Sequence, residues 1–122
     1  MNVVIPLILV SVMLNAAAQL LLKAAMDRVG EFAFNVSNIF PIVKQLATNP
    51  FIIMGGFTYI ASIAVWLLVL SRAEVSYAYP MISLGYIVTA IAAYFFMGES
   101  LSVERILGIL IIIAGVYLVA KT

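Results

Sequence analysis

The sequence predicts an all-α integral membrane protein with four transmembrane helices and an interfacial amphipathic helix between the first and second spans. Hydrophobic residues make up 66% of the 122 residues, charged residues only 9%, and the mean hydropathy is +1.26. A soluble domain is about 45–50% apolar and about 25% charged. Four apolar stretches, each near the ~20 residues that cross the hydrocarbon core, use up most of the chain. We therefore expect residues 1–122 to form one transmembrane domain without a soluble one.

The four expected spans cover residues 3–25, 51–70, 75–96 and 103–120. The first lacks a basic leader and a small-residue cleavage site, so we expect a permanent helix and not a removed signal peptide. Ser102 is the expected N-cap of the last span, and Lys121 ends that span. Lys and Arg are divided so evenly between the two sides that the positive-inside rule leaves both a single and a dual topology open.

The segment between the first two spans is polar at its start and then amphipathic. Ser37 and Asn38 are the expected caps of a short helix that ends before Pro50, and Pro41 fits only if it lies in the first turn. Four aliphatic residues share one face of this helix: Ile39, Ile42, Val43 and Leu46. Polar side chains lie on or near the other face, so we expect the helix to rest in the membrane interface.

Composition excludes several kinds of chemistry. The chain has no His and no Cys, which are the usual ligands of zinc, haem and iron–sulfur sites, so we expect no cofactor, no metal and no enzymatic reaction. A net charge of +1 argues against a nucleic-acid partner. The glutamates all lie at span edges, whereas proton-driven cation export usually needs a carboxylate inside the membrane. These glutamates are Glu31, Glu74, Glu99 and Glu104.

A polar stripe runs along the first span. Asn15, Gln19 and Lys23 recur every four residues, so they lie on one helical face, with Asn15 about 12 Å deeper than Lys23. One interpretation is structural: the amides bond to neighbouring helices while the lysine reaches the head groups. The other is a path on which Lys23, aided by Arg28, attracts a phosphate and the amides guide a polar head group inward. We favour the path, because three aligned polar groups are harder to explain by packing than one.

The second and third spans offer matching faces. One stripe of the third span carries Ser76, Tyr79 and Ser83. Pro80 lies within this stripe and has no N–H, so the Ser76 carbonyl lacks its helical hydrogen bond and is free to bind another group. Broken helices of transporters commonly place such groups at substrate sites. Tyr59 and Trp66 lie on one face of the second span and form an expected aromatic wall. Packing alone also explains each of these patterns.

The last span is almost free of polar side chains. Gly108 and Gly115 lie on one side of it, and small residues let helices approach closely in lipid. We therefore expect this helix to make the oligomer contact and not to line the substrate path.

These residues resemble the drug/metabolite transporter superfamily in its short, four-helix, small multidrug resistance-like form. The resemblance covers almost the whole chain, and its clearest part is Gly98-Glu99 before a last helix with two glycines. In the small multidrug resistance branch that helix joins two antiparallel protomers, and a membrane-embedded Glu precedes the first-helix Lys by eight residues. Asn15 stands at that place here, and Ile82 stands in place of a third-helix Trp. Proton-coupled export of quaternary cations is therefore the less favoured function.

The chain is more similar to the subunits of the undecaprenyl-phosphate aminoarabinose flippase, which are short members of the same superfamily. The similar stretches are Ala18-Gln19 with Lys23, residues 66–70, and residues 78–81 with Ser83-Leu84. This resemblance implies a heterodimer with a paralogous subunit in the bacterial inner membrane, and a homodimer stays open for this chain. The implied cargo is a polyprenyl-phosphate lipid or a lipid-linked sugar, moved between leaflets.

We thus expect a lipid flippase. Lys23 and Arg28 would hold the phosphate, and the substrate-binding face would be completed by Asn15, Gln19, Tyr59, Trp66, Ser76, Tyr79 and Ser83. The prenyl tail would stay in lipid, and only the head group would pass along the polar face. The polar atoms of the head group would then avoid the cost of lacking hydrogen-bond partners in hydrocarbon. The alternatives are efflux of cationic or amphipathic compounds, and a non-transporting membrane subunit of a larger complex.

Overall fold

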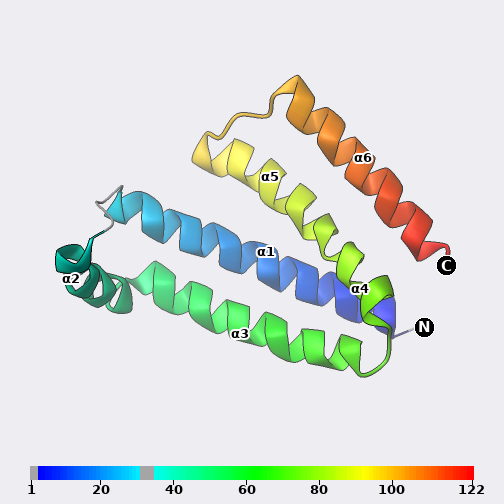
Figure 1. The fold of residues 1–122 in the computed structure, drawn as a ribbon, viewed down its shortest axis with the longest axis horizontal. Helices are drawn as coiled ribbons and strands as arrows, with labels where there is room; N and C mark the ends of the chain where they lie inside the picture. The colour runs from blue at the N-terminus through cyan, green and yellow to red at the C-terminus, as the bar shows by residue number, and fades with distance from the viewer. Residues whose placement is uncertain (1–2, 31–34) are drawn as a thin grey trace.

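The protein is all-helical over the residues that the computed structural model describes, 3–30 and 35–122 (Figure 1). Glu31 lies outside these residues. The helices of the described part are α1 (Val4–Val29), α2 (Val36–Ala47), α3 (Pro50–Leu70), α4 (Val75–Met81), α5 (Ser83–Met97) and α6 (Val103–Ala120). Within the described residues, four segments are long and apolar enough to cross a membrane: α1, α3, α4 with α5, and α6. The predicted fold class is confirmed.

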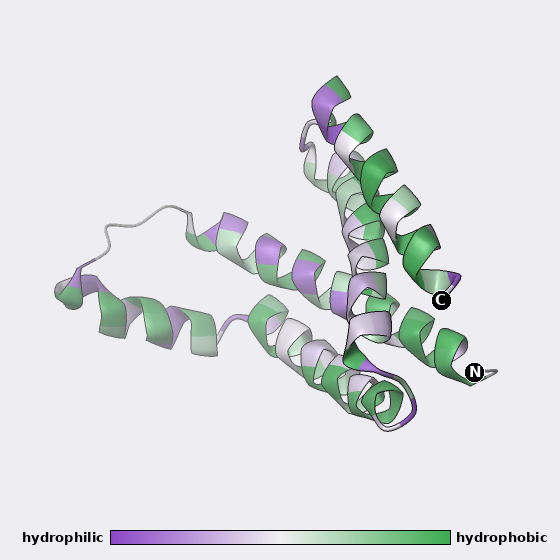
Figure 2. Cartoon of the chain, turned by 45° about the vertical axis from the view of Figure 1, so that its right-hand side comes forward, coloured by the Kyte–Doolittle hydropathy of each residue, from purple (hydrophilic) through white to green (hydrophobic). Residues whose placement is uncertain are grey.

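Helix α1 lies between α3 and α5 (Figure 1). It runs antiparallel to α3 along most of its length, while α5 crosses its opposite side and α6 packs at the edge on α4 and α5. The first turn of α1, the turn between α3 and α4, and the C-terminus lie at one end of the molecule. Helix α2 extends from the other end, and Figure 2 shows green and purple residues alternating along it, as an amphipathic helix requires.

Two glycines let the neighbours approach α1 closely. A Cβ built on Gly55 of α3 would stand 3.1 Å from the Leu22 Cδ2 atom, and one built on Gly85 of α5 would stand 3.2 Å from the Val12 Cγ1 atom. Lipid tails are as apolar as leucine, so helices in a bilayer associate through such close packing and not through the hydrophobic effect. Gly55 and Gly85 therefore fix both packing partners of α1.

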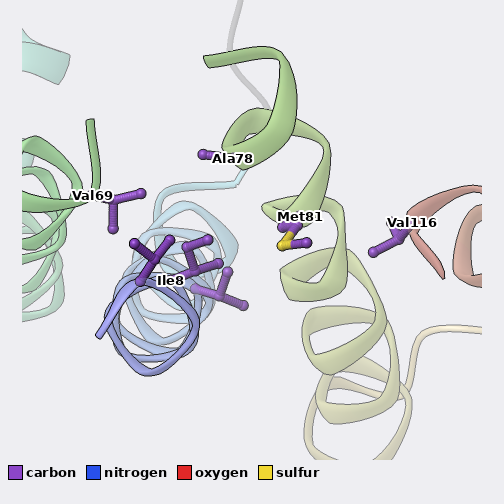
Figure 3. Close-up of a cluster of buried hydrophobic side chains, with 7 residues drawn as sticks. Ile8, Val69, Ala78, Met81 and Val116 are labelled. Atoms are coloured by element: carbon purple, nitrogen blue, oxygen red, sulfur yellow. The ribbon is translucent and has the colours of Figure 1, made fainter. Parts of the chain in front are cut away.

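Buried aliphatic side chains gather where the start of α1 meets α3, α4 and α6 (Figure 3). In this view Ile8 points towards Val69 and Ala78, and Met81 lies between α1 and Val116 of α6. We call this group the apolar cluster. It consists of Val4, Ile8, Val12, Val69, Ala78, Met81 and Val116.

The third span is broken. Pro80 has no N–H, so the Ser76 carbonyl loses its helical partner, and the helix ends at Met81 and resumes at Ser83. At the break the Ile82 N–H donates to the Tyr79 carbonyl at 3.0 Å, a bond over three residues, and the Ser83 hydroxyl donates to the Pro80 carbonyl at 2.5 Å. The span predicted as residues 75–96 is thus two helices that meet at Ile82.

Asn35, not Ser37 or Asn38, caps α2. The Asn35 Oδ1 atom accepts hydrogen bonds from the Ser37 hydroxyl at 2.6 Å and the Asn38 N–H at 3.1 Å. The helix also continues past its first turn through Pro41, contrary to the sequence prediction. This is possible because Pro41 and the residues around it are exposed, so water or head groups can satisfy the freed carbonyl.

The predicted N-cap of α6 is confirmed: the Ser102 hydroxyl accepts from the Arg105 N–H at 3.1 Å.

We predict that Gly55→Leu lowers the free energy of unfolding by about 1–3 kcal/mol, because the new side chain must push α3 away from α1. Gly56→Leu is the matched control, since nothing lies within 4 Å of a Cβ at Gly56. Both substitutions gain the same helix propensity, so the difference between them reports the close contact. Unfolding in mixed micelles measures both, and equal stabilities would show that the approach at Gly55 is not needed.

Candidate functional site

A cavity of about 330 Å³ lies between α1, α3 and the α4–α5 break. We call it the polar cavity. Its lining combines two serines, an amide and three aromatic rings with aliphatic side chains: Ser11, Val12, Asn15, Tyr59, Ser62, Ile63, Trp66, Tyr79 and Ile82. The apolar cluster adjoins it on the side of the α1 N-terminus, because Val12 belongs to both groups.

Two hydroxyls of the polar cavity are already hydrogen-bonded to α3. The buried Ser11 hydroxyl donates to the Ser62 carbonyl at 3.2 Å, and the Ser62 hydroxyl donates to the Tyr59 carbonyl at 2.6 Å. The first bond ties α1 to α3 across the cavity, and the second stays within α3. These serines therefore shape the cavity wall before any ligand binds.

The Asn15 amide is different. Within the described part of the chain no hydrogen bond engages it, although Asn15 is half-buried and lines the cavity. The amide nitrogen and oxygen are not fully buried, so water or a polar group that enters the cavity can reach them. Asn15 is thus the group in this cavity that is most available for recognition.

Aromatic rings form one wall of the cavity. The Trp66 ring of α3 meets the Tyr79 ring of α4 edge to face, with centroids 6.3 Å apart and planes at 70°. Such pairs are favoured by the ring quadrupoles. The contact joins Trp66, which the sequence placed on the second span, to Tyr79, which it placed on the third. Tyr59 of α3 lines the same cavity.

The basic residues lie farther along α1. The Lys23 Nζ atom is 3.0 Å from the Asp27 Oδ1 atom, and both side chains are about half exposed, at 52% each. The Arg28 guanidinium sits 4.3 Å above the Phe51 ring of α3. An exposed pair between residues four apart is weak, so Asp27 leaves Lys23 available to another anion at little cost.

The structure thus divides the predicted site. Asn15, Tyr59, Trp66 and Tyr79 line one cavity, whereas Gln19, Lys23 and Arg28 lie beyond it on α1. Two predicted residues lie elsewhere: Ser76 is exposed near the start of α4, and Ser83 lines a different groove.

Sequence reasoning missed Ser11 as a site residue, and left Ser62 out of the predicted set. Ser11 stands four residues before Asn15, so it continues the same stripe and could have been found by extending the period. Ser62 lies on the face of α3 that carries Tyr59 and Trp66. The hydrogen bond between these two serines depends on the register of α1 against α3, which the sequence does not show.

The glycines of α6 serve no close contact within the described chain. Nothing lies within 4 Å of a Cβ built on Gly108 or on Gly115. Most of α6 is exposed, and Val116 is its only buried residue. The face that carries the two glycines is therefore open.

Comparison with known proteins agrees with this architecture. The model of the EamA-like transporter family matches residues 2–121. A probable 4-amino-4-deoxy-L-arabinose-phosphoundecaprenol flippase subunit ArnF from Erwinia tasmaniensis is 33% identical over 115 residues, which is 89% of this chain and 87% of the relative. The ArnF subunit from Enterobacter sp. (strain 638) is 32% identical over 116 residues, 91% and 89% of the two chains.

The ArnE subunits match a shorter part. The one from Pseudomonas fluorescens (strain Pf0-1) is 37% identical over 73 residues, 60% of this chain and 64% of the relative. Matches to the other ArnE relatives cover between 50% and 60% of their length. No solved structure matches the chain significantly. The family match over nearly the full length shows that the chain belongs to the EamA-like transporter family, and the four membrane-spanning segments among the described residues agree with it.

Proposed function

We propose that the protein moves a polyprenyl-phosphate-linked sugar, or a similar lipid-linked head group, between the leaflets of the bacterial inner membrane. The observation that carries this proposal is the polar cavity within the helix bundle, in which the Asn15 amide has no hydrogen-bond partner in the described chain. The relatives named as flippase subunits support the class of cargo.

The head group would enter from the basic end of α1. Lys23, with Arg28 five residues further along α1, would hold the phosphate near the interface, and Gln19 would lie between Lys23 and the cavity. Asn15 is eight residues from Lys23, or about 12 Å along the helix, which is a distance a phosphate-linked sugar can bridge. The aromatic wall of Trp66 and Tyr79 would pack against the sugar ring.

The apolar cluster would close the path at its far end. It lies towards the start of α1 from the polar cavity and is joined to α4 through Ala78 and Met81. Crossing to the other leaflet then requires α4 to move, and the break at Ile82 gives α4 a joint at which to do so. No covalent bond changes in this process, so the protein would act without an enzymatic step.

The working unit would be a dimer, either of two copies or with a paralogous subunit. Support comes from the exposed α6 with Gly108 and Gly115 on its surface, and from relatives that are named as subunits. Small residues on an exposed membrane helix favour helix association.

We predict that Lys23→Ala weakens retention of a polyprenyl phosphate by at least about tenfold, because the charge-assisted contact to the phosphate is lost. Lys44→Ala removes the same charge from exposed α2 and should change retention little. Native mass spectrometry of the purified protein measures retention, and unfolding curves confirm that both variants fold. Wild-type retention in Lys23→Ala would remove the central residue of the scheme.

The same measurement with a quaternary cation tests the alternatives. Retention of the cation that weakens on acidification would favour efflux, and retention of neither the lipid nor the cation would favour a non-transporting subunit.

We predict that two substitutions in the polar cavity affect different properties, one the retention of lipid and the other the stability of the fold. Asn15→Ala should weaken retention of the sugar-bearing lipid about 3-fold to 10-fold, the value of one neutral hydrogen bond, without loss of stability, because the amide has no protein partner. Ser11→Ala should lower the free energy of unfolding by about 0.6 kcal/mol, typical of a hydrogen bond between membrane helices. Lipid titrations and unfolding curves test both. A stability loss in Asn15→Ala would assign Asn15 to packing.

A further inference from the structure

A second groove, of about 520 Å³, lies between the α4–α5 break and α6. We call it the apolar groove. Its lining is almost entirely hydrocarbon: Tyr79, Pro80, Ile82, Ser83, Ile112, Gly115, Val116 and Val119. The Ser83 hydroxyl already donates to the Pro80 carbonyl, so the groove presents no free hydroxyl donor from Ser83 to a polar ligand.

The apolar groove adjoins the polar cavity. Tyr79 and Ile82 line both, on either side of Pro80 at the helix break. The break therefore separates a compartment with an unpartnered amide and several polar side chains from one whose lining is mostly hydrocarbon. A ligand with a polar head and an apolar chain matches the two compartments in that order.

We propose that the apolar groove holds the first part of the apolar chain of the lipid whose head group occupies the polar cavity. This inference rests on the proposed function, and it refines the expectation that the whole tail stays in lipid. The chain would pass Tyr79 and Ile82, lie against α6 at Gly115 and Val116, and then leave for the bilayer. Its occupant is thus a lipid chain and not a helix of a second copy, because only the chain is tied to the polar cavity.

The groove would act through shape. A chain that leaves the bilayer for an apolar groove gains no hydrophobic stabilisation, since lipid and groove are equally apolar. What the groove supplies is a fixed exit for the chain, which orients the head group against Asn15 and the aromatic wall. Gly115 makes room for this exit: nothing lies within 4 Å of a Cβ at that position.

The experiment uses the full chain in nanodiscs and a polyprenyl phosphate that carries a photoreactive diazirine on its first isoprene unit. In the wild type we expect adducts on α6 between residues 112 and 119. Gly115→Leu should lower these adducts at least fivefold, and Gly115→Ala should give an intermediate loss because it adds only one methyl group. Ala114→Leu is the matched control: it lies on the same helix, Ala114 is exposed, and it does not line the groove.

The outcomes separate the two proposals. Adducts that are spread over lipid-facing helices and are unchanged in Gly115→Leu would overturn the chain site, while Lys23-dependent retention of the same probe would leave the proposed function standing. No retention and no adduct would overturn both. Loss of the dimer in Gly115→Leu and Gly108→Leu alike, without α6 adducts in the wild type, would assign the groove to a second copy.

Discussion

The close approach of two helices to α1 is the constraint on which the rest of the structure depends. In a bilayer, burial of apolar surface does not draw helices together, so packing distance decides which helices associate. Gly55 brings α3 to α1, and Gly85 brings α5 to the opposite side. The polar cavity opens beside the Gly85 contact, since Val12 takes part in both. Its walls on α3 and at the α4–α5 break are held against α1 by these two approaches.

Polar groups in the bundle follow a clear division. Most buried hydroxyls donate to a backbone carbonyl nearby, as Ser11 does to Ser62 across two helices. The Ser11 bond joins α1 to α3, whereas the Ser62 and Ser83 bonds are local, and each uses the donor of its hydroxyl. Asn15 differs, since the described residues give its amide no partner.

Hydropathy was sufficient to predict the four spans, because length and apolar content alone determine what crosses a bilayer. Period-four spacing was sufficient to place Asn15, Gln19 and Lys23 on one face. Local signals were less reliable: Asn35 caps α2 where Ser37 and Asn38 were expected, since all three can accept from a backbone N–H and only the final turn geometry selects one. The Lys23 pair with Asp27 depends on side-chain rotamers, and the separation of Ser83 from the cavity depends on the break at Ile82. A helical period encodes neither of them.

The sharing of Tyr79 and Ile82 by two compartments has a consequence for how such transporters diversify. The further walls of the polar cavity come from α1 and α3, whereas the further wall of the apolar groove comes from α6. For the proposed lipid, substitutions on one set of helices would alter head-group selectivity while chain selectivity stays constant, and the reverse. Tyr79 and Ile82 have no such freedom, because a change at either residue alters both compartments together.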